Sequence, residues 1–153
     1  MKKFIKMIPI FTIILLASGC AKTKVTECTL DNDQSKSGYK IVTTYKIYSK
    51  GDIVNKVTSE EILTSKNNTI LKYFENLNKK QYEAQNKTYG GYTFDIKAEK
   101  GIVTSNLTID YTKLDMNKFI NDNSAMKSYV NKNNKFTLDG AKTMYQSLGA
   151  TCK

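Results

Sequence analysis

Residues 92–109 alternate between apolar and polar side chains more regularly than the rest of the chain. Strict alternation over this length predicts two antiparallel strands with one face buried and the other in water. A turn at Lys100-Gly101 gives the buried face the pairs Ala98 with Val103, Ile96 with Ser105, Phe94 with Leu107, and Tyr92 with Ile109. The chain must therefore build a sheet with one apolar face, and that face needs a second layer to cover it.

Three further segments have the composition of strands. Residues 25–30, 39–48 and 53–63 are rich in Ile, Val, Thr and Tyr, and a polar loop at 31–38 follows the first of them. A hairpin turn at Lys50-Gly51 predicts Ile47 opposite Val54 and Tyr45 opposite Lys56. Neither face of this second hairpin is cleanly apolar, so its register is only weakly specified.

The apolar period becomes helical at 66–86, where Ile70, Phe74, Leu77 and Gln81 fall on one stripe with Tyr73 and Ala84 beside it. Shorter helices are expected near 116–120 and 126–130. Thr137 can cap a last helix, with Leu138, Ala141, Tyr145 and Leu148 on one stripe and Gly149 ending it. The order of elements predicts a two-layer α+β domain, in which helices pack on one face of a four- or five-stranded antiparallel sheet.

The first 20 residues have the parts of a secretory signal peptide. Lys2, Lys3 and Lys6 precede an apolar run at 7–17, which is too short to span a bilayer at ~20 residues. The ending Leu-Ala-Ser-Gly-Cys resembles the lipobox of bacterial lipoproteins. That resemblance implies cleavage before Cys20 and acylation of its thiol, with palmitate among the chains. Ordinary secretion and an uncleaved anchor are the alternatives.

We therefore expect a signal peptide at 1–19, a short lipid-anchored tether at 20–27 and a single α+β domain at 28–153. The mature protein would be extracytoplasmic, on the outer face of the cytoplasmic membrane. The abundance of Lys and Asn, with no Arg, is typical of an AT-rich genome and favours a Gram-positive-like host.

Acylation of Cys20 would leave Cys28 and Cys152 as a pair. An extracytoplasmic location permits a disulfide between them. Such a bond would close nearly the whole domain into one loop, which is worth on the order of 4–5 kcal/mol in the chain-entropy model. Two free buried thiols are the alternative.

The chain is basic, with a formal net charge of +10 that falls to +7 once Lys2, Lys3 and Lys6 leave with the signal peptide. This charge favours anionic lipid headgroups or wall polymers as partners, alongside the membrane itself through the acyl chains. A solvated lysine surface is the plainer interpretation. Nucleic acid is not expected, because Arg, the usual reader of bases, is absent.

The absence of His excludes Ser-His-Asp and Cys-His catalysis and the common zinc sites, so we expect no metal and no cofactor. Glu60 and Glu61 are adjacent in a predicted strand and point to opposite faces, so they cannot act as an acid–base pair. The sequence thus contains no recognisable catalytic group. An unrecognised hydrolase using Lys or carboxylate groups stays open.

The most unusual local cluster is Tyr89-Gly90-Gly91, followed by Tyr92. An exposed Tyr beside flexible Gly can form a binding surface for a sugar or a peptide. The alternative is a helix-to-strand turn with Tyr92 in the core.

The mature chain resembles the small YehR-like bacterial lipoproteins. The resemblance rests on Cys20 in its lipobox, the strands after it, Thr-Ile-Asp-Tyr at 108–111 with Lys-Leu-Asp at 113–115, and Ser-Leu-Gly-Ala at 147–150. It implies an α+β fold and a lipid anchor, and no catalytic residues. We expect a membrane-tethered, non-enzymatic binding or interaction domain of the cell envelope, with a hydrolase or a purely structural envelope protein as alternatives.

Overall fold

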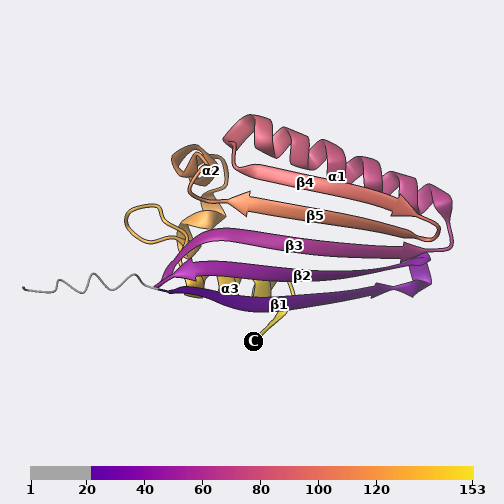
Figure 1. The fold of residues 1–153 in the computed structure, drawn as a ribbon, viewed down its shortest axis with the longest axis horizontal. Helices are drawn as coiled ribbons and strands as arrows, with labels where there is room; N and C mark the ends of the chain where they lie inside the picture. The colour runs from indigo at the N-terminus through magenta and orange to yellow at the C-terminus, as the bar shows by residue number, and fades with distance from the viewer. Residues whose placement is uncertain (1–21) are drawn as a thin grey trace, which may run out of the picture.

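The structure, a computed structural model, describes residues 22–153 (Figure 1). The predicted signal peptide at 1–19 and the acylation site Cys20 lie outside the described residues. The strands are β1 (Thr23–Gln34), β2 (Tyr39–Lys50), β3 (Ile53–Ser65), β4 (Tyr92–Glu99), β5 (Ile102–Asp110) and β6 (Thr151–Cys152). The helices are α1 (Asn68–Tyr89), α2 (Met116–Asp122) and α3 (Leu138–Ser147), with 3₁₀ turns η1 (Ser35–Ser37) and η2 (Ser124–Tyr129).

The predicted α+β class is confirmed, with one open antiparallel sheet in the order β4-β5-β3-β2-β1-β6. The sheet has six strands rather than four or five. The extra strand, β6, is two residues long, too short for alternation to reveal it. β1 begins at Thr23, so most of the segment expected to be a tether at 20–27 belongs to the sheet.

The two hairpins differ in how well their registers could be predicted. β4 and β5 pair as expected, with Tyr92 opposite Ile109 and Phe94 opposite Leu107. The register predicted between β2 and β3 is wrong, because Ile47 lies opposite Val57 rather than Val54. The shift in register arises from a β-bulge at Tyr48/Ser49. The alternation of apolar and polar residues in the sequence does not reveal such a bulge.

The helices cover one face of the sheet, and two apolar clusters form beneath them. Figure 1 shows α1 running along β4, while α3 lies behind β1 and β2. The larger cluster, under α3, contains Cys28, Ile47, Val54, Val57, Phe136, Ala141, Tyr145 and Ala150. The smaller cluster, under α1, contains Leu63, Leu71 and Val103.

A polar group of Glu61, Asn78 and Ser105 also lies on the covered face. Asn78, which α1 buries, donates to Glu61 Oε1 at 2.7 Å and to Ser105 Oγ at 3.0 Å. These bonds satisfy the N–H groups of the buried amide, so their burial is not penalised as that of an unpaired donor would be.

This polar contact explains why the predicted stripe of the long helix is only partly right: Phe74 packs on the smaller cluster, but the rest of the predicted stripe is largely exposed. Leu71 and Asn78 are the buried residues of α1, whereas Leu77 is 41% exposed and Tyr73 61% exposed. Hydrophobic periodicity selects the most apolar stripe. The face that packs on this sheet is partly polar, because it meets Glu61 and Ser105.

The C-terminal third follows the predicted pattern with two differences. Thr137 caps α3 by accepting a hydrogen bond from Gly140 N at 3.0 Å, as expected. Residues 124–129 form a 3₁₀ turn rather than an α-helix. Leu148, expected on the buried stripe, is 59% exposed because it follows the end of α3.

Cys28 and Cys152 are joined by a disulfide, as predicted. Their Cα atoms are 4.0 Å apart because β6 pairs with β1 at this position. Cys28 is fully buried in the larger cluster, so the bond holds the segment after α3 against the sheet.

Reduction of this disulfide is expected to lower the free energy of unfolding by about 2–5 kcal/mol, because the bond spans a separation of 124 residues. Urea unfolding of the same protein with and without reductant measures the difference, and a Cys28→Ser/Cys152→Ser variant serves as the reductant control. An unchanged midpoint on reduction would contradict the expectation.

Candidate functional site

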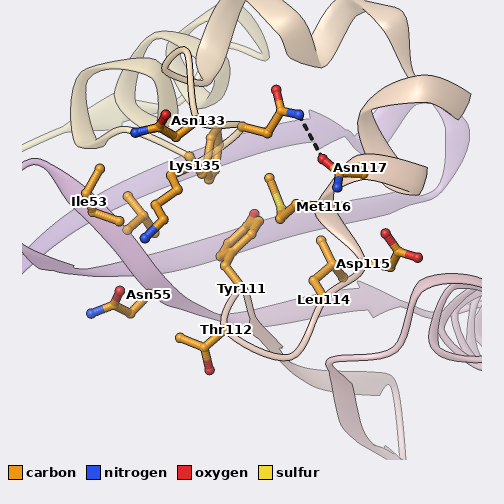
Figure 2. A pocket seen from close by; sticks show the side chains of 13 residues that line it. Ile53, Asn55, Tyr111, Thr112, Leu114, Asp115, Met116, Asn117, Asn133 and Lys135 are labelled. Carbon is orange, nitrogen blue, oxygen red and sulfur yellow. Dashed lines mark hydrogen bonds between the residues drawn. The ribbon is translucent and has the colours of Figure 1, made fainter.

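A cavity of about 520 Å³ opens at the end of the sheet where β3 begins (Figure 2). Its walls come from three segments far apart in the chain: residues 53–55 at the start of β3, residues 111–117 between β5 and α2, and residues 133–136 before α3. Thr23 lies at this same end, because it pairs with Lys50, which pairs with Ile53.

Backbone hydrogen bonds hold these three walls together. Val54 N donates to Phe136 O at 2.9 Å, and Tyr111 N donates to Asn55 O at 2.9 Å. Asn134 then ties the third wall to the second by donating from Nδ2 to Asn117 Oδ1 at 2.8 Å (Figure 2). The cavity is therefore preformed rather than a gap between loose loops, as small-molecule sites usually are.

The loop at 131–135 is held by its own first residue. Asn131 Oδ1 accepts from Asn133 N at 2.9 Å and from Lys135 N at 3.1 Å. Asn134 adopts a positive φ of 56°, a conformation that Asn tolerates better than most residues. These bonds hold the backbone that carries Asn133 and Lys135 at the mouth of the cavity.

The cavity has an apolar floor and a polar, mostly uncharged rim. Phe136 is fully buried on the floor, and its ring packs on Tyr111 with centroids 4.9 Å apart. Burial raises the pKa of Tyr111 well above its usual value, so its hydroxyl is neutral. The rim carries the amides of Asn55, Asn117, Asn133 and Asn134 and the hydroxyl of Thr112.

Two charged side chains line the cavity, Lys135 and Asp115. Asp115 is occupied as the N-cap of α2, where its Oδ1 accepts from Lys118 N at 3.0 Å. Lys135 has no carboxylate within 4.0 Å among the residues that the structure describes. In Figure 2 its side chain extends toward Asn55, while Asp115 lies on the other side of Tyr111. The charge available to a ligand is thus positive.

Asp110, at the end of β5, holds the second wall in shape. Its Oδ1 accepts from Thr112 Oγ1 at 2.6 Å and from Thr112 N at 3.0 Å. These hydrogen bonds, the side-chain one first, hold the pKa of Asp110 below its usual value. The carboxylate is therefore already engaged in hydrogen bonds within the loop that it supports.

The predicted binding surface of Tyr89, Gly90 and Gly91 does not line this cavity. It contacts the end of β5, the loop that follows it, and α2, which together form one wall. The Tyr89 ring packs edge-on against Phe119, and its hydroxyl lies 3.1 Å from Asp122 Oδ2. Tyr89 O accepts from Asp115 N at 2.8 Å. Gly91 O accepts from Asp110 N at 2.8 Å. These residues thus make packing and backbone contacts at the junction of α1 and β4, and the binding surface predicted there stays a prediction.

The uncovered face of the sheet is polar, and a hollow of about 390 Å³ lies on it among Lys46, Tyr48, Glu60 and Asn106. Glu60 lies on this face and Glu61 on the other, so the two carboxylates are separated by the sheet, as predicted. Among residues 22–153, no group of three or more His, Cys, Asp or Glu side chains could hold a metal ion. No helix in that range is long and apolar enough to cross a membrane.

Sequence reasoning missed the cavity entirely. Its Asn residues belong to three segments and have no common spacing, and Asn is abundant throughout the chain. The one local signal is the polar run at 131–135, which ends at the buried Phe136. That run reads as an ordinary loop until the fold brings it against β3.

These features define a class of small α+β protein, in which helices cover one face of an open antiparallel sheet and a disulfide joins the last strand to the first. The fold is similar to that of two proteins with NMR structures. Escherichia coli YehR is 19% identical, with a TM-score of 0.54 over 84% of this chain and 91% of YehR. A protein from Streptococcus pneumoniae TIGR4 is 11% identical, with a TM-score of 0.52 over 100% of this chain and 98% of that one.

The resemblance to YehR-like proteins is thus confirmed at the level of the fold. No protein-family model and no curated protein matches the sequence. At these identities the likeness shows a shared fold, and functional residues must be argued from this chain alone.

Substitution of Gly91 is expected to disrupt the wall at 111–115. A Cβ there would lie 2.7 Å from Asp110 O and 3.1 Å from Leu114 N, at a φ of +76°. Gly91→Ala should lower the free energy of unfolding by more than about 2 kcal/mol. Gly51→Ala is the matched control, because its φ is +58° but no atom lies within 4 Å, and it should cost about 1 kcal/mol. Equal losses in urea unfolding would show that the close approach at Gly91 is unimportant.

Proposed function

We propose that the protein is a lipid-anchored, extracytoplasmic binding protein of the cell envelope, and that its ligand occupies the cavity between β3, α2 and the loop at 133–136. The observation that carries this proposal is the preformed cavity with its amide-rich rim and apolar floor. Sites of this kind bind a ligand through a few directed polar groups over an apolar base.

The lipid anchor rests on the sequence, in which Ser18-Gly19-Cys20 ends an apolar run. Only two residues lie between Cys20 and Thr23, where β1 begins, so the two positions are at most about 10 Å apart along the chain. An acylated Cys20 would thus hold the sheet close to the headgroups of the outer face of the membrane. The end of the sheet nearest to them would be the one that carries the cavity, because Thr23 lies there.

A binding role fits this cavity better than a hydrolytic one. Asp115, the one carboxylate on the described walls, already caps α2. Within residues 22–153, the Lys135 amine has no carboxylate within 4.0 Å that would pair it for acid–base or nucleophilic chemistry. The ligand classes that suit a basic, amide-lined site on an envelope surface are an anionic lipid, a wall polymer or a segment of another envelope protein.

The anchor is tested with the full chain and a Cys20→Ala variant expressed in a Gram-positive host. The wild type should incorporate labelled palmitate and partition into the detergent phase. The variant should lose the label, because no thiol is left to acylate. Palmitate incorporation that persists in Cys20→Ala would refute acylation at this residue.

Binding at the cavity is tested by thermal unfolding of the lipid-anchored protein with wall fragments, peptides and lipid vesicles. A ligand at about 100 times its dissociation constant should add about 2.7 kcal/mol and raise the midpoint. Asn133→Trp, at the mouth of the cavity, should abolish the rise, and Asn76→Trp, exposed on α1, should preserve it. A rise of the unfolding midpoint that persists in Asn133→Trp would show that the ligand binds outside this cavity.

A further inference from the structure

The end of the sheet that carries the cavity also gathers basic side chains. We call the group of Lys22, Lys24, Lys50, Lys132 and Lys135 the basic rim. No carboxylate of the described chain lies within 4.0 Å of any of these amines.

The acidic side chains at this end are largely engaged. Asp110 and Asp122 are paired with Lys113 and Lys118, and Asp115 caps α2. Asp52, in the turn between β2 and β3, and Asp139, in the first turn of α3 beside it, offset two charges of the basic rim. The field at this end is therefore positive. Each Lys near a membrane rich in anionic lipid raises the affinity of such a surface for that membrane about fivefold.

The interior of the cavity also favours an anionic ligand. Lys135 extends toward Asn55 (Figure 2), and the side-chain amides of Asn55 and Asn133, which also line the cavity, can donate to the same ligand. A tetrahedral phosphate accepts from several donors at once, and a charged donor strengthens each such contact. Leu114 and Met116 also line the cavity and add an apolar surface, which the methylenes of a lipid can cover and free inorganic phosphate cannot.

We infer that the cavity binds the headgroup phosphate of an anionic phospholipid in the same membrane that holds the anchor. The inference rests on the proposed function for the anchor at Cys20, which would bring this end to the membrane. It identifies the ligand of the proposed site as a lipid. Binding would fix the orientation of the domain, with the strands of the sheet along the membrane normal and the open face of the sheet accessible from the side.

The test uses the lipid-anchored protein reconstituted in phosphatidylcholine vesicles, with or without phosphatidylglycerol. Amide hydrogen exchange is followed at 111–117 and 131–136, which form the walls, and at 35–37, the opposite end of β1. Phosphatidylglycerol should slow exchange in the two wall segments and leave 35–37 unchanged.

Two variants separate the cavity from general charge attraction. Lys135→Gln should raise the phosphatidylglycerol fraction needed for half-protection about tenfold, because it removes the charged donor. Lys24→Gln, which removes an exposed charge of the basic rim outside the lining of the cavity, should raise that fraction by clearly less. Equal effects of the two variants would overturn the inference.

Protection by inorganic phosphate in pure phosphatidylcholine vesicles, equal to that from phosphatidylglycerol, would replace the lipid by a free phosphate ligand. No protection by either, together with a thermal shift by wall fragments that Asn133→Trp abolishes, would refute the lipid and leave the proposed binding function standing. Loss of both responses would refute the function as well.

Discussion

The register of the antiparallel sheet places Ile47, Val57 and Ile109 in one row across β2, β3 and β5 on the covered face. Because side chains alternate, a slip of one residue in any of these strands would turn its apolar residues toward water. The larger apolar cluster forms against this row, and the stacking of Tyr145 on Tyr45, with centroids 4.2 Å apart, locates α3 there. The helical layer therefore depends on pairings made within the sheet.

The covered face is not uniformly apolar, and this determines how α1 packs on the sheet. Asn78 of α1 meets Glu61 and Ser105, and the amide is satisfied by both. A helix with a strongly apolar stripe would leave the Glu61 carboxylate without a donor, which is costly at a partly buried site. The exposed Tyr73 and Leu77 show the consequence, since the orientation of α1 follows the polar contact rather than maximal apolar burial.

The candidate site forms where the sheet ends and the helices do not cover it. Hydrogen bonds from Val54 to Phe136 and from Tyr111 to Asn55 bring two loops against the start of β3 and leave a space between them. The Tyr89-Gly90-Gly91 turn contributes from behind, because only a residue without a Cβ permits the approach to Asp110 O and Leu114 N. The residues that looked functional in the sequence thus support the residues that line the cavity.

Local patterns determined much of this protein. The β4–β5 pairing, the Thr137 cap, the α+β class and a pairing of Cys28 with Cys152 were all predictable, because alternation, caps and cysteine count act within short segments or by elimination. Tertiary structure alone decided the β2–β3 register with its bulge, the buried face of α1 and the cavity. Each of these depends on contacts between residues far apart in the chain, and such contacts select among local options that the sequence leaves nearly equal in energy.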